Sequence, residues 1–389
     1  MINQSFKNWS VENKRIFLRA DLNIPIENGT ILNDFRLRSI TPTIDCIIKK
    51  QGSIVLATHI GRPKNKEPNL STKILVPWFL DHGYSIHLVE DISAVPSLPV
   101  KPQEIILLEN LRFFSGEKDA DPFFAKQLAR TASYYINDAF GLIHENDCSV
   151  ALLPYEFPEE KRSIGLLIEK ELKELSILKN DPPRPFIGIL GGGKIKNKIP
   201  LIQHLLHTVD MVFIYPALCF TFIKSQAMPV GKSLVDDALL KVCKEIINEA
   251  ENLSIPLFFP KDYEVTYNIE KKDLSIVEAD NFPTDAIGIT VGPKSIQECI
   301  AHIKQAKTVF LNCAMGFADQ PKTQEASKKI IEAMAQSSAT TIIAGGDSVN
   351  IALQTKNHDK ISYLSTGGGA ALAYLSDKIL PGLAPFAEE

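Results

Sequence analysis

The chain has 389 residues, of which 45% are hydrophobic and 23% are charged, and its formal net charge is −4. This length predicts two domains, and the balanced charge argues against a nucleic-acid partner because neither half is broadly basic. The longest apolar stretch, residues 211–223, is too short to span a membrane. The first residues show no secretion signal and the six cysteines form no C-x-x-C pair, so we expect a cytoplasmic protein with reduced thiols.

Short apolar runs alternate with longer helical patterns along the whole chain. Strands are predicted at 15–20, 53–58, 84–89, 104–108, 133–137, 186–190, 211–214, 256–259, 286–290, 307–311, 340–343 and 361–364. Helices are predicted near 36–50, 72–82, 121–132, 166–180, 197–208, 234–252, 295–305, 322–337, 347–355 and 369–378. This alternation predicts an α/β protein with parallel sheets covered by helices on both faces. In such sheets, ligands bind at the carboxyl ends of the strands.

Cationic side chains recur at the predicted strand ends of the first half. Arg36, Arg62 and Arg112 lie at or near these ends, with Asn23 and His59 beside them. A structural arginine at one strand end is common. Several at one edge of a sheet favour a small, highly anionic ligand, since the guanidinium fork matches phosphate and carboxylate.

Residues 166–180 form one amphipathic helical pattern, which ends in Asp181-Pro182-Pro183. A helix followed by two prolines is a good connector between domains. An ordinary surface helix within one domain is the alternative.

Glycine-rich loops follow the predicted strands of the second half. Gly191–Gly193 precede Lys194 and Lys198, which share a face if they are helical. Such a loop at a helix N-terminus suits a phosphate chain, although a turn with solvated lysines is the alternative. Further loops contain Gly345, Gly346 and Asp347, and then Gly367–Gly369. Asp347 is the best candidate for Mg²⁺, which takes one or two carboxylates plus phosphate oxygens. The pattern therefore predicts a nucleotide with a metal ion.

Seven motifs occur in the order seen in one known family. They are Arg-Ala-Asp-Leu-Asn-Ile-Pro (19–25), Thr-His-Ile-Gly-Arg-Pro (58–63), Glu-Asn-Leu-Arg-Phe (109–113), Asn-Asp-Ala-Phe-Gly (137–141), Gly-Gly-Gly-Lys-Ile-Lys-Asn-Lys (191–198), Ala-Gly-Gly-Asp-Ser (344–348) and Ser-Thr-Gly-Gly-Gly-Ala (365–370). The chain resembles the phosphoglycerate kinase family nearly end to end. The resemblance implies reversible phosphoryl transfer between ATP and 3-phosphoglycerate, giving ADP and 1,3-bisphosphoglycerate.

The resemblance also implies a domain arrangement with two Rossmann-like parallel-sheet domains, and a cleft and hinge between them. Residues 1–165 would bind the triose phosphate, 166–180 would form the interdomain helix, and 181–371 would bind the Mg-nucleotide. Residues 372–389 would pack back on the N-terminal domain, and a monomer is expected.

Site residues carried over from the family fall into two groups. Asp21, Asn23, Arg36, His59, Arg62 and Arg112 would hold the phosphoglycerate. Lys194, Lys198, Asn312, Asp319, Gly345, Gly346, Asp347 and Ser348 would hold the nucleotide, with Asp347 on the metal. Arg36, Lys194, Gly367 and Gly368 would stabilise the migrating phosphoryl group, since its transition state spreads negative charge over equatorial oxygens.

The chain departs from the family pattern at the periphery of both expected sites. The substrate-contacting arginine of the family is Glu145 here, and a nearby histidine is Asp147. On the nucleotide side the departures are Asn197, Tyr215-Pro216-Ala217, Cys313-Ala314 and Asp319. A carboxylate beside a phosphate ester would be repulsive. These changes leave two alternatives to phosphoglycerate kinase: a kinase with an altered anionic substrate, and a nucleotide-binding paralogue with little turnover.

Overall fold

The computed structural model describes residues 5–270 and 273–387, and the chain forms two compact units. Unit 1 extends to Lys173 and resumes at Ile379, whereas unit 2 is the continuous segment Glu174–Lys378. Across the described ranges, no helix has the length and apolar character that a membrane crossing requires.

Unit 1 is built on a six-stranded sheet in the order β5-β6-β4-β1-β7-β8, and every recorded pairing in it is parallel. Its strands are β1 (Arg15–Ala20), β4 (Ser53–Ala57), β5 (Ser85–Val89), β6 (Glu104–Leu108), β7 (Tyr134–Asp138) and β8 (Arg162–Ile164). All residues of β1 and β4 are buried, which agrees with the apolar runs 16–18 and 54–57 within them. A small hairpin, β2 (Ile26–Glu27) and β3 (Thr30–Ile31), follows β1.

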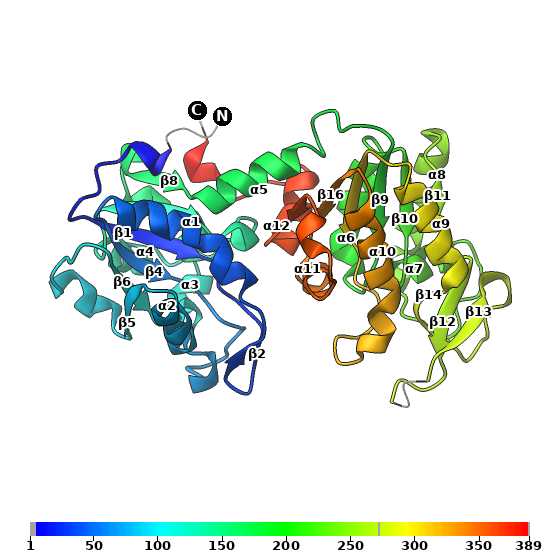
Figure 1. Ribbon diagram of the computed structural model, residues 1–389, viewed down its shortest axis with the longest axis horizontal. Coiled ribbons are helices and arrows are strands. Elements are labelled where there is room, and N and C mark those ends of the chain that lie inside the picture. The colour runs from blue at the N-terminus through cyan, green and yellow to red at the C-terminus, as the bar shows by residue number, and fades with distance from the viewer. Residues whose placement is uncertain (1–4, 271–272, 388–389) are drawn as a thin grey trace. The chain divides into compact units, whose positions relative to one another are not determined.

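Helices cover this sheet (Figure 1). They are α1 (Phe35–Lys49), α2 (Val76–Asp81), α3 (Ser115–Lys118), α4 (Pro122–Ala129) and the start of α5 (Leu166–Ser176). The division between the units falls within α5, between Lys173 and Glu174. The helix predicted over 166–180 therefore ends earlier, at Ser176.

Unit 2 contains a second six-stranded parallel sheet, in the order β11-β10-β9-β15-β16-β17. Its strands are β9 (Phe186–Leu190), β10 (Met211–Ile214), β11 (Leu257–Phe258), β15 (Thr308–Asn312), β16 (Thr340–Ile343) and β17 (Tyr363–Leu364). Its helices are α6 (Ile195–Leu205), α7 (Leu218–Ser225), α8 (Leu240–Asn252), α9 (Pro293–Ile303), α10 (Glu325–Gln336), α11 (Gly346–Leu353) and α12 (Gly368–Leu375). Counted in chain order, the strands lie 3-2-1-4-5-6, which is the doubly wound order of dinucleotide-binding folds.

The predicted α/β class with two parallel sheets is confirmed, but one predicted strand does not belong to either parallel sheet. The strand predicted at 286–290 is β14 (Ile287–Val291), which pairs antiparallel with β12 (Asp262–Thr266) rather than joining the parallel sheet. With β13 (Ser275–Glu278) these strands form a separate three-stranded sheet. The sequence patterns also missed α3, α7, β8, β12 and β13.

The C-terminal segment belongs to unit 1 from Ile379 onward, later than the residue 372 expected from the sequence. The side chain of Asn137 on β7 donates a hydrogen bond to the Gly382 carbonyl (2.9 Å), and the Gly382 N–H donates to Ile143 O (2.9 Å). The Phe386 ring stacks on Tyr135, with centroids 6.3 Å apart. Gly382 and Phe386 thus pack against β7 and the loop that follows it, and they form part of the core of unit 1.

A fully buried ion pair joins three segments of unit 1. Arg19 of β1 lies 3.3 Å from Glu117 of α3, and both side chains are inaccessible to solvent. Ser149 connects them: its hydroxyl lies 2.6 Å from both Arg19 Nε and Glu117 Oε1, and its N–H donates to Glu117 Oε2 (3.0 Å). Because both charges are hydrogen-bonded, the pair fixes the end of β1, α3 and the segment around Ser149 relative to one another.

Removing one charge of this pair is expected to destabilise the protein strongly. Glu117→Gln leaves Arg19 as an uncompensated buried cation, which typically costs about 3–5 kcal/mol. Denaturant unfolding should show this loss, whereas Glu90→Gln, which breaks the exposed Lys66–Glu90 pair, should change stability by less than about 1 kcal/mol. Equal effects of the two substitutions would contradict the structural role of the Arg19–Glu117 pair.

Candidate active site

The first group of predicted site residues lies where the strand order of unit 1 reverses. Crossovers from β1 lead to β4 on one side and eventually to β7 on the other, and Arg19 and Ala20 of β1 pair with Asn137 and Asp138 of β7. The loops that follow β1 and β7 therefore leave the sheet at the same edge. Such a switch point is where open α/β sheets bind ligands.

Asp21, directly after β1, forms an ion pair with Arg36 on the first turn of α1. Burial alone would raise the pKa of Asp21, but the positive charges of Arg36 and Arg19, together with the hydrogen bond from the Asn23 N–H, outweigh it and lower the pKa. A side chain at Gly141, in the loop after β7, would overlap the Asp21 carboxylate. The glycine of the Asn-Asp-Ala-Phe-Gly motif is thus required for Asp21 and Arg36 to meet.

His59 and Asn23 lie on the loops that follow β4 and β1. His59 is only 2% exposed, and burial lowers its pKa well below the usual value, more than the Asp21 charge can restore. It is therefore a neutral imidazole at physiological pH, and its buried Nδ1 makes no hydrogen bond among the described residues. Asn23 Oδ1 accepts a hydrogen bond from the Gly61 N–H (2.9 Å), which joins the two loops.

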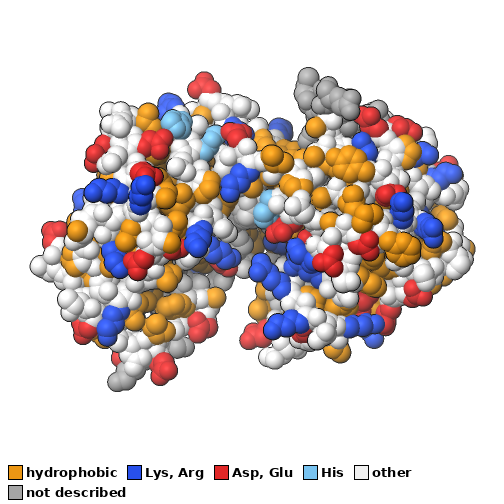
Figure 2. Space-filling model, turned by 180° about the vertical axis from the view of Figure 1, so that it is seen from behind, with side chains coloured by type: hydrophobic (Ala, Val, Ile, Leu, Met, Phe, Trp, Pro, Cys, Tyr) orange, Lys and Arg blue, Asp and Glu red, His pale blue; other side chains and the backbone are white. Residues whose placement is uncertain are grey.

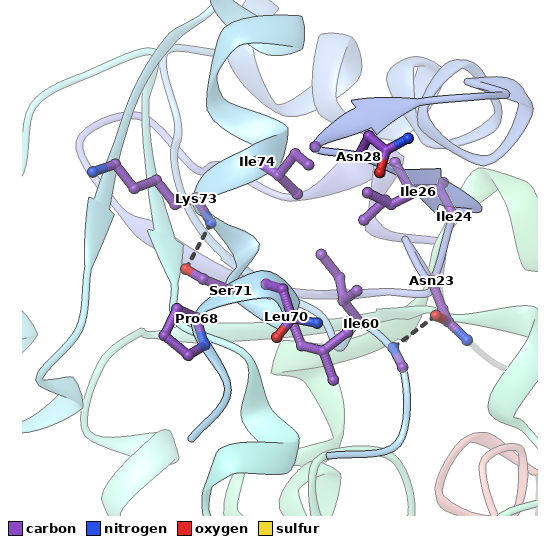
Figure 3. A pocket seen from close by; sticks show the side chains of 13 residues that line it. Asn23, Ile24, Ile26, Asn28, Ile60, Pro68, Leu70, Ser71, Lys73 and Ile74 are labelled. Atoms are coloured by element: carbon purple, nitrogen blue, oxygen red, sulfur yellow. Dashed lines mark hydrogen bonds between the residues drawn. The ribbon is translucent and has the colours of Figure 1, made fainter. Parts of the chain in front are cut away.

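A pocket of about 620 Å³ adjoins Asn23 and Gly61 (Figure 3). Figure 3 shows apolar side chains around it, together with Lys73, Ser71 and asparagines. The apolar members are Ile24, Ile26, Ile60, Leu70 and Ile74. This lining suits an apolar group better than a phosphate.

A second pocket of unit 1, of about 350 Å³, is lined by Arg62, Pro63, Arg112, Lys118 and Glu145. Arg112 is held in place because its Nη1 donates to Gly61 O (2.8 Å). Arg62 is exposed, and it has no recorded hydrogen bond or ion pair within the described ranges. Cations that converge on a small concave surface suit a phosphate or carboxylate group.

The carboxylates of Glu145 and Asp147 both face Lys118. Lys118 Nζ lies 2.6 Å from Asp147 Oδ1 and 3.4 Å from Glu145 Oε2. Asp147 is buried, with a side chain 1% exposed, and its other oxygen lies 3.6 Å from Arg112 Nη2. Glu145 is more exposed than Asp147 and lines the pocket. The repulsion expected from these carboxylates is therefore offset by a lysine that sequence motifs did not identify.

The glycine loops of unit 2 lie at the corresponding switch point, between β9 and β15. Asn312, the last residue of β15, pairs with Leu190, the last residue of β9. The N–H groups of Gly191 and Gly192 then donate to Asn312 O (3.1 Å) and Pro216 O (2.8 Å). Gly192 has φ +91°, which favours glycine.

The loops after β15, β16 and β17 pack closely on one another. The Asn312 side-chain amide donates to Ala344 O (2.8 Å), and Gly345, with φ +105°, leaves room for that amide. A Cβ on Gly368, the first residue of α12, would lie 2.9 Å from the Gly345 Cα. Only glycine lets the N-termini of α11 and α12 approach this closely. Their free N–H groups favour an anion.

Lys194 and Lys198 have different surroundings. Lys194 caps the start of α6 and is exposed, whereas Lys198 is 7% exposed. Burial lowers the pKa of Lys198, and the neighbouring Lys194 charge lowers it further, while Asp347 raises it. Within the part of the chain that the structure describes, no hydrogen bond or ion pair is recorded for the Lys198 ammonium. A buried, unpaired cation is costly unless an anion is bound.

Three further residues of unit 2, Ser348, Asp319 and Asn197, differ in their distance from the glycine loops. Ser348 is buried on the first turn of α11, next to the exposed Asp347 and Gly346. Asp319 lies in the exposed turn before Pro321, and the structure records no contact between it and the glycine loops among the described residues. Asn197 lines a pocket of about 430 Å³ with Gly193, Lys194 and Asp236. The structure therefore brings most of the predicted nucleotide residues together, and Asp319 stays outside this group.

Among the residues that the structure describes, the face of the molecule shown in Figure 2 carries no broad basic patch. On the face shown in Figure 2, lysine and arginine side chains lie in small groups interspersed with acidic and hydrophobic ones. An anion site on this face would therefore depend on individually placed cations.

Comparison with known proteins identifies the family. The family model described as phosphoglycerate kinase matches residues 6–378. The chain belongs to the phosphoglycerate kinase family. Phosphoglycerate kinase of Finegoldia magna is 34% identical over 395 residues, covering 98% of each chain. That of Chlamydia pneumoniae is 35% identical over 385 residues, covering 96% of each. The solved structure of phosphoglycerate kinase from Coxiella burnetii has a TM-score of 0.83 at 28% identity, covering 98% of each chain. The family resemblance found in the sequence is thus confirmed.

The close packing at Gly191 predicts a local effect of substitution. A Cβ there would lie 2.5 Å from the Cys313 sulfur and 3.0 Å from Pro216 O. Gly191→Ala should therefore lower the free energy of unfolding by about 1–3 kcal/mol and weaken ATP binding as the loop shifts. Gly188→Ala in β9 is the matched control, because its Cβ would meet its neighbours at ordinary distances of 3.8–3.9 Å. If both variants bind ATP like the parent protein, the Gly191 loop does not shape the nucleotide site.

Proposed function

We propose that this chain transfers the γ-phosphoryl group of ATP to the carboxylate of 3-phosphoglycerate, reversibly, as a phosphoglycerate kinase of glycolysis and gluconeogenesis. The observation that carries the proposal is the contrast between two switch points in a chain of this family. The switch point of unit 1 gathers Arg36, Arg62 and Arg112 near Asp21 and His59. That of unit 2 gathers glycine loops and helix N-termini around a buried lysine.

In unit 1, the cations would divide between the two ends of the substrate. Arg36, oriented by Asp21, would face the carboxylate that receives the phosphoryl group, with His59 and Asn23 beside it. Arg62 and Arg112 would bind the phosphate ester in the pocket of about 350 Å³. Bidentate arginine contacts fix orientation as well as charge.

In unit 2, the glycine loops would bind the nucleotide phosphates through backbone N–H groups, and Lys198 would supply their buried counter-charge. Asn312 and Ser348 would help to hold the nucleotide, and Gly345 and Gly346 would let its phosphates approach the start of α11. Asp319 would contact the ribose of the nucleotide. Because it lies in an exposed turn outside the glycine loops, it would approach the ribose from that turn.

A magnesium ion fits the donor set of this loop, with Asp347 as its protein ligand. Asp347 is exposed, and no ion pair or hydrogen bond of its carboxylate is recorded within the described ranges. Mg²⁺ is commonly bound by one or two carboxylates together with substrate phosphates. When bound, the ion would neutralise charge on the phosphate oxygens.

Phosphoryl transfer needs positioning and electrostatic stabilisation rather than covalent chemistry by the protein. Lys194, exposed at the start of α6, and Arg36 would offset the charge that develops on the transferring group. Gly367 and Gly368 would present the N-terminus of α12 to it. Because these groups belong to different units, we propose that the units close about the segments that join them and exclude water, in a protein acting as a monomer.

A coupled assay of ATP consumption with 3-phosphoglycerate and Mg²⁺ tests the proposal. Turnover of about 1–100 s⁻¹, which is typical of kinases, is expected. Nucleotide binding without turnover would favour the inactive paralogue. Turnover only with another anionic acceptor would favour an altered substrate, the alternative that Glu145 in the pocket suggests.

The role of Lys194 predicts an asymmetric kinetic effect. Lys194→Ala should lower kcat by about 100-fold or more, while the ATP dissociation constant changes far less, because the ammonium acts mainly in the transition state. Lys196→Ala, which removes a neighbouring exposed lysine, is the control and should retain activity. An equal loss of kcat and ATP affinity in Lys194→Ala would contradict the assigned role.

A further inference from the structure

The pocket of about 350 Å³ in unit 1 contains a third cation, Lys118, that neither composition nor family motifs assign to the site. We propose that Lys118 binds the phosphate ester of 3-phosphoglycerate together with Arg62 and Arg112, and that it provides the cationic contact absent at position 145. The inference rests on the proposed function, because it concerns the same substrate.

The position of Lys118 is fixed by the protein core. It is the last residue of α3, and the preceding residue, Glu117, is the buried partner of Arg19. Its backbone is therefore held in place, while its side chain remains 51% exposed, and Lys118 lines the same pocket as Arg62 and Arg112. A lysine whose backbone is held by the core and whose ammonium is open to solvent can bind a ligand with little loss of conformational freedom.

The hydrogen-bonding capacity of Lys118 leaves room for a ligand. An ammonium group has three donors, and the structure places two carboxylates near it, Asp147 at 2.6 Å and Glu145 at 3.4 Å. Burial lowers the pKa of Lys118, but the hydrogen bond and charge of Asp147, with Glu145, outweigh it and raise the pKa. The Lys118 ammonium is thus cationic at neutral pH. One of its three N–H donors faces neither carboxylate, and the donor that faces Glu145 makes a long contact that a ligand could replace.

The charges around the pocket show why this lysine matters. Arg62 and Arg112 alone would only balance Glu145 and Asp147. With Lys118 there are three cations against two carboxylates. His144, 3.6 Å from Glu145, adds no charge at neutral pH because burial lowers its pKa. A dianionic phosphate ester therefore meets a net positive pocket only when Lys118 is present.

A purely structural role for Lys118 is the competing explanation, because Asp147 is a buried carboxylate that needs a partner. Two variants separate the roles. Lys118→Met keeps the apolar stem and removes the charge. The double variant Lys118→Met with Asp147→Asn also removes the buried carboxylate, so that the net charge of the pocket equals that of the parent protein. A change that persists in the double variant therefore reports the lost contact.

The test is steady-state kinetics of the full-length protein, with thermal unfolding measured in parallel. We expect the KM for 3-phosphoglycerate to rise about tenfold or more in both variants, as the loss of a charge-assisted hydrogen bond implies. The KM for ATP should stay within about twofold, and Lys118→Arg should restore most of the affinity for 3-phosphoglycerate. Lys66→Met, which removes an exposed, ion-paired lysine of the same unit, should leave both constants unchanged.

Two results would overturn the inference. One is an unchanged KM for 3-phosphoglycerate in Lys118→Met, and the other is a return to the parent KM in the double variant. Failure of the proposed function is distinguishable, since the parent protein itself would then neither turn over nor bind 3-phosphoglycerate in a calorimetric titration.

Discussion

The buried Arg19–Glu117 ion pair is the constraint on which the arrangement of unit 1 depends. Two charges in a dry core are tolerated only when nearly every polar atom is satisfied. Here that requirement brings β1, α3 and the segment around Ser149 into one arrangement. Asp21 follows Arg19 by two residues, Lys118 follows Glu117, and Asp147 precedes Ser149 by two. The buried Arg19–Glu117 pair thus helps to set the positions of Asp21, Lys118 and Asp147.

The two units place different side-chain chemistry at the carboxyl edges of similar sheets. In both, the reversal of strand order separates two loops and leaves a space at the carboxyl edge. Unit 1 fills the rim of that space with arginines, which suit a small ligand whose charge must be matched from several sides. Unit 2 fills it with glycines and helix N-termini, which suit an extended phosphate chain that the backbone can follow.

The sequence was a good guide to the parallel sheets and a poor guide to two kinds of feature. Helix α7 was missed because residues 218–223 are all buried, and a helix that is apolar on every side has no 3.6-residue pattern to detect. The antiparallel pairing of β14 was missed because alternation of strands and helices predicts only parallel neighbours. Motifs predicted Lys198 and Asp347 as site residues, since each belongs to a local run. Lys118 had no such signal, because its partners lie at 145 and 147 and only the fold brings them near.

The path of the chain through the two units has a consequence for synthesis. Unit 2 is one uninterrupted segment, whereas unit 1 needs Gly382 and Phe386 to finish the core beside β7. Domains usually fold in the order in which they leave the ribosome. In this chain, synthesis of unit 1 starts before that of unit 2, but its last segment, from Ile379, is made after unit 2. The core of unit 1 beside β7 would therefore be completed only after all of unit 2 has been synthesised.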